Sequence, residues 1–317
     1  MNNDHINQAN KQKFRIIVLF IIAMFLGIFL YKTFIFIKQN DISMHKTEQC
    51  ANVKGDVWLI SYADGNDIHL MNQNALSASA LNNCIDHISL YRKKHIDSEF
   101  TEKNKHILNQ SHGVGYWLWK PYLIMETLKK IPENDIVVYV DTGIKIRNNI
   151  SDLLNNLAQK DIVLFGSMFK IRSYTKRDLL KFLNMDNAET LNAQQTQGGI
   201  IIVRNTKYSR QFINKWLELS QNEQLITDIP SENEYPDFIN HRHDQSIISL
   251  LALQNQQNII FVPFEEKHRY FYHHRRRNTN FIPLVIDGTL LIEKNIDPKK
   301  PLSFWDNMIY QTLLMIN

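Results

Sequence analysis

The sequence is poor in cysteine and has little excess charge. Only two of its 317 residues are cysteines, Cys50 and Cys84. One potential pair does not make a disulfide framework, and the sequence leaves open whether these two residues pair or are unrelated thiols. The formal net charge is only +4 at pH 7, so no global basic excess indicates nucleic acid, and we expect no nucleic-acid partner. Internal repeats and low-complexity blocks are also lacking.

What the chain does contain begins with a long apolar run. FRIIVLFIIAMFLGIFLYKTFIFI spans residues 14–37, and no charged residue separates Arg15 from Lys32. About 20 apolar residues cross a bilayer, so the run predicts one transmembrane helix. A cleaved signal peptide usually has a shorter apolar region that ends in small residues. A helix that is apolar all round needs lipid or protein on every side, which disfavours a core helix.

Charges around this run predict its orientation. Lys11, Lys13 and Arg15 precede the segment, whereas Lys38 and Asp41 follow it. The positive-inside rule then places the N-terminus in the cytoplasm and the large domain across the membrane, as in a single-pass type II membrane protein. The predicted parts are a cytoplasmic tail, a transmembrane anchor, a polar stem and a catalytic-type domain, at residues 1–13, 14–37, 38–55 and 56–317.

The large domain alternates apolar strands with helical patterns, and its hydrophobic content of 44% fits a folded core. The predicted strands are continuous apolar runs rich in Val and Ile at 57–63, 135–141, 161–166, 198–204 and 258–263. Predicted helices lie at 121–131, 150–158, 176–183, 209–219 and 244–253. Such strands are covered on both faces. The order predicts an α/β fold, a three-layer αβα domain with a mostly parallel sheet.

One acid ends an otherwise buried strand. DIVVYVDTG places Asp141 where ligands collect, at the carboxyl end of a strand in an open α/β sheet. A buried carboxylate is costly without a cation or strong donors, and a divalent metal on a diphosphate would offset that cost. Mg²⁺ takes one or two carboxylates plus phosphate oxygens, and Mn²⁺ favours similar ligands. The alternative is an aspartate that only caps a turn.

Two glycine-containing segments offer further candidates. GVGYWLWKP, residues 113–121, predicts an aromatic loop in which Trp117 stacks on a base or sugar and Lys120 meets a phosphate. TQGGIIIV, residues 196–203, places Gly198 and Gly199 at the start of a strand, where substrate can lie against the backbone and Gln197 can contact it. The alternatives are an aromatic core plug and a tight turn.

Histidines and arginines cluster late in the chain. HRHDQS opens a helix, with Asp244 as its expected N-cap or, with His243, as a substrate contact. His241, His243 and Asp244 lack the Cys or Glu that would complete a common zinc set. FYHHRRRN carries Arg275 and Arg276, whose guanidinium forks suit pyrophosphate oxygens. The alternative is a solvated basic surface.

Taken in order, these motifs resemble the GT-A fold of nucleotide-sugar glycosyltransferases, closest to the galactosyltransferase-like and glycogenin-like group. VVYVDTGIKI followed by ISDLL is similar to that group's Asp-x-Asp strand and the acidic helix after it. The family's helix with a basic residue near the diphosphate is matched in place by GYWLWKPYLIMETL. Its glycine-bearing strand resembles QGGIIIV, and its Asp-Gln helix resembles HDQSIISLL. The resemblance covers about residues 56–280.

The resemblance implies a site and a cofactor. Asp141 would bind a weakly held divalent cation, Mn²⁺ or Mg²⁺, and Asp244 with Gln245 would orient the donor sugar or the acceptor hydroxyl. The second acid of Asp-x-Asp is Gly143 here, so the other metal ligand would be a late histidine, His273 or His274. The expected partners are a UDP- or GDP-sugar donor, a glycan or glycoconjugate acceptor, and the membrane.

The expected function is therefore a membrane-anchored, hexosyltransferase-like glycosyltransferase. Gly143 motivates an alternative, a non-catalytic glycan- or nucleotide-binding protein on the same fold. A second alternative is a metal-dependent phosphoesterase that uses His241, His243, Asp244 and Asp141. The expected location is the Golgi membrane in a eukaryote and the cell membrane in a bacterium.

Overall fold

The computed structural model describes residues 15–32, 50, 52–64, 67–80, 83–273, 282–286, 289–293 and 308. The chain divides into two compact units. One comprises residues 44–279, and the other comprises residues 1–43 together with 280–317.

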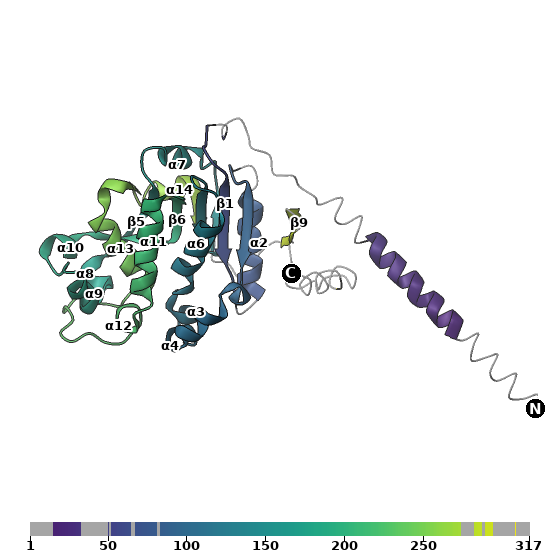
Figure 1. Cartoon of the computed structure of the whole chain (residues 1–317), viewed down its shortest axis with the longest axis horizontal. Coiled ribbons are helices and arrows are strands. Elements are labelled where there is room, and N and C mark those ends of the chain that lie inside the picture. Colours follow the sequence, from purple (N-terminus) through teal and green to yellow (C-terminus); the bar gives the residue numbers. More distant parts are fainter. Residues whose placement is uncertain are drawn as a thin grey trace, which may run out of the picture. The chain divides into compact units, whose positions relative to one another are not determined.

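The larger unit contains a six-stranded sheet in the order β2-β1-β3-β6-β5-β7. Figure 1 labels β1, β5 and β6 of this sheet. Its strands are β1 (Val57–Tyr62), β2 (His87–Tyr91), β3 (Ile136–Val140), β5 (Ile162–Lys170), β6 (Gln194–Arg204) and β7 (Ile259–Val262). β6 runs antiparallel to both of its neighbours, and every other neighbouring pair in the sheet is parallel. The mostly parallel sheet predicted from the sequence is thus confirmed.

Helices cover both faces of this sheet, which gives three layers. Along β3, Val137 and Tyr139 pack into one buried cluster, whereas Val138 and Val140 pack into the other. This alternation explains the unbroken apolar run, because both faces of the strand need apolar side chains. The first cluster is covered by α6 (Trp119–Lys130), α11 (Lys207–Ser220) and α13 (His243–Gln254), and the second by α2 (Asp67–Ala80) and α7 (Ser151–Asn156).

Short elements complete the larger unit. The helices are α3 (Ser98–Lys103), α4 (Lys105–Leu108), α5 (Gly113–Tyr116), α8 (Ile171–Tyr174), α9 (Arg177–Phe182), α10 (Ala188–Asn192), α12 (Glu223–Ile226) and α14 (Lys267–Tyr270), with 3-10 turns η2 (Lys93–His95) and η3 (Gln256–Asn258). β4 (Ile144–Ile146) pairs with β8 (Phe271–His273) in a separate antiparallel ribbon that sets Ile144 opposite His273. This pairing brings the segment 271–273 beside the turn that follows β3.

Each predicted strand and helix has a counterpart, and the differences have physical causes. The predicted strand at 198–204 begins earlier, at Gln194, because its polar first part pairs with the long strand β5. β2 was not predicted, since it lies at the edge of the sheet and all five of its residues are only half-buried. A half-buried edge strand lacks the apolar run that marks the central strands.

A disulfide joins Cys50 to Cys84. It settles the question that the sequence leaves open, and both residues are buried in the second cluster. The bond ties the chain ahead of β1 to the segment between α2 and β2, so Cys50, although it falls in the predicted stem, is packed in the folded unit. Of that stem, residues 38–49 and Ala51 lie outside the described residues.

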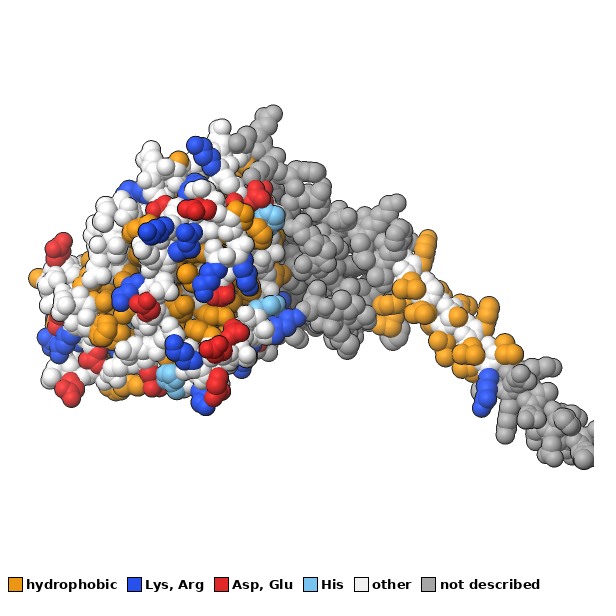
Figure 2. Space-filling model, in the orientation of Figure 1, with side chains coloured by type: hydrophobic (Ala, Val, Ile, Leu, Met, Phe, Trp, Pro, Cys, Tyr) orange, Lys and Arg blue, Asp and Glu red, His pale blue; other side chains and the backbone are white. Residues whose placement is uncertain are grey.

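The smaller unit contains the apolar helix Arg15–Lys32 and an antiparallel pair, β9 (Ile282–Ile286) with β10 (Thr289–Glu293). The helix has 18 residues and a mean hydropathy of 2.2, which is long and apolar enough to cross a membrane by length and composition. Figure 2 shows its hydrophobic side chains on the surface, and Leu19 and Phe20 are 64% and 72% exposed. Residues 14 and 33–37 of the predicted anchor lie outside the described residues.

Candidate functional site

The site begins with a left-handed turn in the GVGYWLWKP segment. All residues from Gly113 to Trp117 have positive φ, including the non-glycine residues Val114, Tyr116 and Trp117 at 51°, 50° and 58°. Left-handed backbone costs roughly 1–2 kcal/mol for each such residue. The Trp119 indole stabilises the turn by donating a hydrogen bond to the Gly113 carbonyl at 3.1 Å and stacking on Tyr62. Backbone strain of this kind tends to concentrate at functional sites.

The turn leads into α6, where Lys120 bridges two acids. Its ammonium donates to Asp244 Oδ2 at 2.7 Å and lies 3.5 Å from Asp141 Oδ1. It also donates to the Gly198 carbonyl at 2.9 Å. The Lys120 side chain is only 3% exposed, and that of Asp244 6%, whereas that of Asp141 is 38% exposed. The Lys120 ammonium thus pairs with the buried Asp244, and it also lies near Asp141, which is partly exposed.

Burial and charge set the protonation of this cluster. Burial by itself lowers the pKa of Lys120, but Asp141 and Asp244 outweigh it, and the net pKa lies above its ordinary value. Burial raises the pKa of Asp244 to about 6 against the opposing effect of Lys120. Burial also raises the pKa of Tyr139 well above its ordinary value, with Asp141 adding to the effect. The Tyr139 hydroxyl therefore stays protonated, and it donates a hydrogen bond to Asp141 Oδ1 at 2.6 Å. No described residue hydrogen-bonds to Asp141 Oδ2.

The paired glycines of β6 make room for the two acids. A Cβ on Gly199 would lie 2.8 Å from Asp141 Oδ2, and one on Gly198 would lie 3.2 Å from Asp244 Oδ2. Any side chain here would push against the carboxylates. In the described chain the two carboxylates lie against these glycines, and the predicted contact of substrate with their backbone stays a prediction.

The amides of the predicted site have protein partners. Gln245 donates to Gln195 Oε1 at 2.8 Å and accepts from the Gly198 amide at 3.4 Å. Gln197 donates to the Gly166 carbonyl at 2.8 Å and is 8% exposed. Gln245 thus reinforces the junction of β6 and α13 next to Asp244, whereas Gln197 is tied to β5.

Two cavities meet at Asp141 and Trp117. The larger, of about 670 Å³, opens where β1 and β3 end, and it is lined by Tyr62, Ala63, Asp64, Ile68, His69, Asn72, Ser111, Gly113, Val114, Trp117, Trp119, Asp141, Thr142, Gly143, Ile144 and His273. The smaller, of about 290 Å³, is lined by His112, Trp117, Lys120, Asp141, Gly198, Gly199, Asp228, Asn240, His241, Arg242, His243, Asp244 and Gln245. Asp141 and Trp117 line both. Small-molecule sites typically occupy about 300–1,000 Å³.

The predicted start of α13 needs a correction. The helix begins at His243 and its N-cap is Arg242, so Asp244 lies inside the first turn and does not cap the helix. The Asp244 carboxylate points to Lys120 instead. The local sequence indicates an acid at the start of a helix. It does not indicate that this acid pairs with the buried ammonium of Lys120 on α6.

His241 has a structural role that removes it from the predicted ligand set. It accepts from the Lys176 amide at Nδ1, and Nε2 contacts the Leu225 carbonyl at 2.9 Å. Burial lowers its pKa well below the ordinary value. With both ring nitrogens bonded to backbone, His241 is not available to a metal, and the phosphoesterase set of four residues loses a member.

The predicted cation ligands Asp141 and His273 line the same cavity, together with Asp64. Carboxylates suit Mg²⁺, and carboxylates with an imidazole suit Mn²⁺. Among the described residues, these three are not a group whose ligand atoms all lie within 4.8 Å of one another. His274, Arg275 and Arg276, the other late candidates, lie outside the described residues.

The site also contains residues that sequence reasoning missed. Tyr139 lies two residues before Asp141 on one strand, so the two-residue alternation of β3 was a usable signal for their contact. His112 and Asp228, which hydrogen-bond at 2.8 Å, are 116 positions apart. No local pattern predicts that contact, because it depends on the fold bringing two loops together.

No family model matches this sequence, and no curated protein matches it. Solved structures similar to this chain include mouse xyloside xylosyltransferase 1, at 9% identity over 66% of this chain and 84% of that one, with a TM-score of 0.39. Another is the galactosyltransferase LgtC, solved with donor and acceptor sugar analogues, at 14% identity over 65% and 73%, with a TM-score of 0.37. A third is glucosyl-3-phosphoglycerate synthase from Mycobacterium tuberculosis, solved with Mn²⁺ and UDP-glucose, at 12% identity over 71% and 76%, with a TM-score of 0.35.

All three TM-scores are below 0.5, and all three identities are below 15%. The likeness is distant, and it assigns neither a family nor an activity to this chain.

Proposed function

We propose that this protein is a glycosyltransferase that transfers a sugar, of hexose type, from a nucleotide-diphosphate donor to a hydroxyl acceptor. The observation that carries the proposal is the Asp141–Lys120–Asp244 cluster at the junction of two cavities. A group-transfer enzyme must hold its donor and acceptor next to each other, and the two cavities share Asp141. The order of motifs along the chain supports the same activity.

The larger cavity is the proposed donor compartment. Its volume of about 670 Å³ suits a nucleotide diphosphate, and Trp117 offers aromatic surface for a base or sugar. Two acids and one ammonium leave the Asp141 cluster with excess negative charge. A diphosphate beside Asp141 would be repelled unless a cation lies between them.

We assign that cation to Asp141 and His273, with Mn²⁺ or Mg²⁺ as the ion. When bound, a divalent cation neutralises charge on the departing diphosphate. Tyr139 and Lys120 both contact Oδ1 of Asp141, and Oδ2 is the oxygen that we assign to the cation. Arg275 and Arg276 remain predicted contacts of the diphosphate oxygens, with His274 as an alternative metal ligand.

The smaller cavity is the proposed site of the acceptor hydroxyl and of part of the donor sugar. Asp244 and Gln245 line it, as do Lys120, Asp141 and the two β6 glycines. Asp244 and Gln245 would orient the sugar or the hydroxyl at the junction. We assign no general base, and hence no stereochemical outcome.

We further propose that the helix Arg15–Lys32 anchors the protein as a single-pass type II membrane protein with residues 1–13 in the cytoplasm. The Cys50–Cys84 bond supports an oxidising compartment for the large domain, since disulfides are rare in the cytosol. That compartment would be the Golgi lumen in a eukaryote, and in a bacterium the anchor would lie in the cell membrane. Replacing Leu19 and Leu26 with lysine should release the protein from sedimented membranes, because charges in the bilayer core cost about 2.5–3.5 kcal/mol each.

The activity is tested with a panel of UDP- and GDP-sugars and glycan acceptors, with and without Mn²⁺, by mass detection of transfer or donor hydrolysis. The expected result is cation-dependent turnover of one donor class, reduced at least about a hundredfold by Asp141→Asn. The matched control is Asp152→Asn, a 61% exposed carboxylate paired with Arg269 outside both cavities, which should keep full activity.

Two outcomes would overturn the proposal. Glycan binding without nucleotide binding would favour the non-catalytic module that Gly143 suggests. Equal activity of Asp141→Asn and Asp152→Asn would remove Asp141 from the chemistry.

A further inference from the structure

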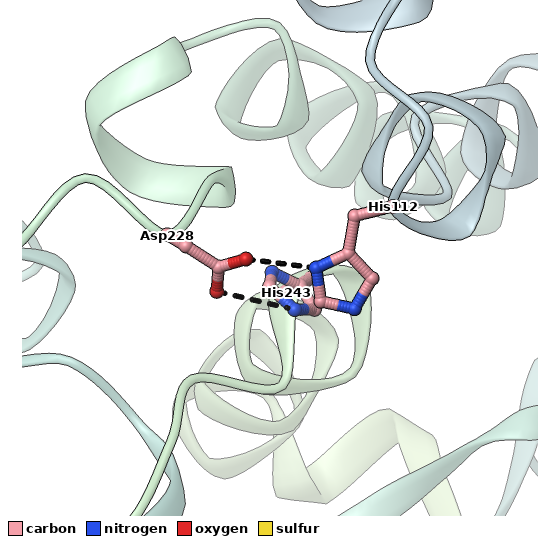
Figure 3. Close-up of side chains that lie close together, drawn as sticks. All are labelled: His112, Asp228 and His243. Atoms are coloured by element: carbon pink, nitrogen blue, oxygen red, sulfur yellow. Dashed lines mark hydrogen bonds and ion pairs between the residues drawn. The ribbon is translucent and has the colours of Figure 1, made fainter.

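Three side chains from separate loops converge on the wall of the smaller cavity (Figure 3). They are His112, which precedes α5; Asp228, which follows α12; and His243, the first residue of α13. One ligand atom from each lies within 4.8 Å of the other two. His112 Nδ1 is 2.8 Å from Asp228 Oδ2, and His243 Nε2 is 3.6 Å from Asp228 Oδ1.

The orientation of His243 turns one ring nitrogen toward backbone and the other toward Asp228. Its Nδ1 lies 2.8 Å from the Ile226 carbonyl, and a carbonyl oxygen only accepts, so Nδ1 carries the proton of that bond. Nε2, the ring nitrogen that does not contact this carbonyl, lies 3.6 Å from Asp228 Oδ1. The ring therefore turns its second nitrogen toward the carboxylate, where both atoms could bind one cation.

The surroundings hold the ring in that position. His243 adopts the left-handed conformation at φ 50°, and Trp117 stacks on its ring with centroids 5.4 Å apart. The loop that carries Asp228 is held by the buried Lys176, which donates to the Thr227 and Ile229 carbonyls at 3.2 and 2.9 Å. A hydrogen bond from the second ring nitrogen to a backbone carbonyl is the usual way in which a metal-binding histidine is oriented.

We propose that His112, Asp228 and His243 form a metal site for a divalent transition ion, with Zn²⁺ the best match. Two imidazole nitrogens and one carboxylate are a frequent zinc ligand set, in which the fourth position stays open to water or substrate. That open position would face the smaller cavity. This site is distinct from the Asp141–His273 cation, and it does not rest on the proposed transferase activity.

The ligand set also predicts which cation each site takes. Imidazole ligands suit Zn²⁺, Cu²⁺ and Ni²⁺, whereas carboxylate and phosphate oxygens suit Mg²⁺ and Mn²⁺. A Zn²⁺ ion should therefore bind at the histidine cluster without nucleotide. Mn²⁺ at Asp141 should bind well only when a diphosphate supplies further oxygens.

The test is metal binding by the tag-free full-length chain in detergent, without nucleotide. Zn²⁺ is titrated by calorimetry, and Co²⁺ serves as a substitute whose visible absorption reports the coordination. We expect one bound ion per chain and at least about a tenfold loss of affinity in His112→Ala and in Asp228→Asn. Both side chains are about half exposed, 50% and 49%, so these variants should fold.

The matched control is His87→Ala. His87 contacts Asp56 at 3.1 Å with similar exposure, and it belongs to no three-ligand group among the described residues. It should bind the metal like the wild type. Absence of bound Zn²⁺ in the wild type, or equal affinity in His87→Ala and His112→Ala, would overturn the site. The two proposals are separated by nucleotide binding. If His112→Ala loses Zn²⁺ affinity but keeps Mn²⁺-dependent nucleotide binding, the zinc site is supported and the transferase proposal is left intact.

Discussion

At the scale of single residues, Lys120 organises the site. Its ammonium is held by two carboxylates and a carbonyl, and it is almost fully enclosed. The sequence predicts Lys120 as a phosphate contact next to an aromatic loop. The structure places Lys120 among the residues that line the smaller cavity, but its ammonium pairs with Asp141 and Asp244. A local motif shows that a lysine is present, and only the fold shows which acids surround it.

Removing this charge should be costly. Lys120→Met leaves two acids near each other, one of them buried, and breaking a buried ion pair from one side costs about 3–5 kcal/mol. Chemical denaturation followed by tryptophan fluorescence measures the free energy of unfolding. Lys129→Met is the control, because its 2.7 Å pair with Glu126 is exposed and should be worth less than about 1 kcal/mol. Equal losses in the two variants would contradict the role of Lys120.

Asp244 should leave a signature in the pH dependence of stability. Its pKa is raised from 3.8 to about 6, so between about pH 4 and 6 the folded state keeps a proton that the unfolded chain has lost. Asp244 therefore lowers the free energy of unfolding as the pH rises through that window, by at most about 3 kcal/mol. Full stabilisation by this group is present only below the unfolded pKa.

The comparison of wild type with Asp244→Asn isolates this effect. Between pH 4 and 6 the free energy of unfolding of the variant should fall less, or rise more, than that of the wild type. Asp152→Asn, which changes an exposed carboxylate, should follow the wild type. Parallel curves for wild type and Asp244→Asn would contradict the raised pKa.

At the scale of elements, the left-handed turn at 113–117 positions both cavities' shared wall. Gly113 and Gly115 are required there, since a Cβ would approach the Trp117 ring to 2.4 Å and Leu108 Cα to 2.7 Å. Val114 is different, because a β-branched residue at φ 51° is strained and nothing requires its side chain for packing at 39% exposure. The turn is held by its surroundings at a cost in stability.

Val114→Gly should therefore stabilise the fold by about 1 kcal/mol. The relief of roughly 1–2 kcal/mol of backbone strain should outweigh the additional conformational entropy that glycine loses on folding. Lys103→Gly, at the exposed last residue of the ordinary helix α3, should instead lose up to about 1 kcal/mol. Denaturation midpoints of the two variants give the comparison. A loss of stability in Val114→Gly similar to that in Lys103→Gly would mean that the turn is not strained at this residue.

The elements that could be predicted from the sequence are those with a strong apolar signal. β3 is an example, because its unbroken IVVYV run is buried on both faces. β4 and β8 were not predicted, since each has three residues and exists only through its pairing with the other. The same limit applied at the site. Asp141, Lys120 and Asp244 were identifiable from motif order, whereas His112 and Asp228 come together only in the folded chain.

At the scale of the whole molecule, the disulfide links Cys50, which precedes β1, to Cys84, which lies between α2 and β2 in the first βαβ unit. Cys50→Ser with Cys84→Ser removes a closed loop with a sequence separation of 34, which should lower the free energy of unfolding by about 3–4 kcal/mol. A reducing agent should lower the stability of the wild type by a similar amount and leave the double variant unchanged. Insensitivity of the wild type to reduction would show that the bond is absent from the protein as isolated.

The central claim is that a nucleotide diphosphate binds in the larger cavity through a cation at Asp141. Calorimetric titration of UDP and GDP into the full-length chain, with and without Mn²⁺, tests it most directly. The account predicts binding by the wild type that requires Mn²⁺, and loss of that binding in Asp141→Asn with Asp152→Asn unaffected. No nucleotide binding by the wild type, or equal Mn²⁺-dependent binding by Asp141→Asn, would contradict it.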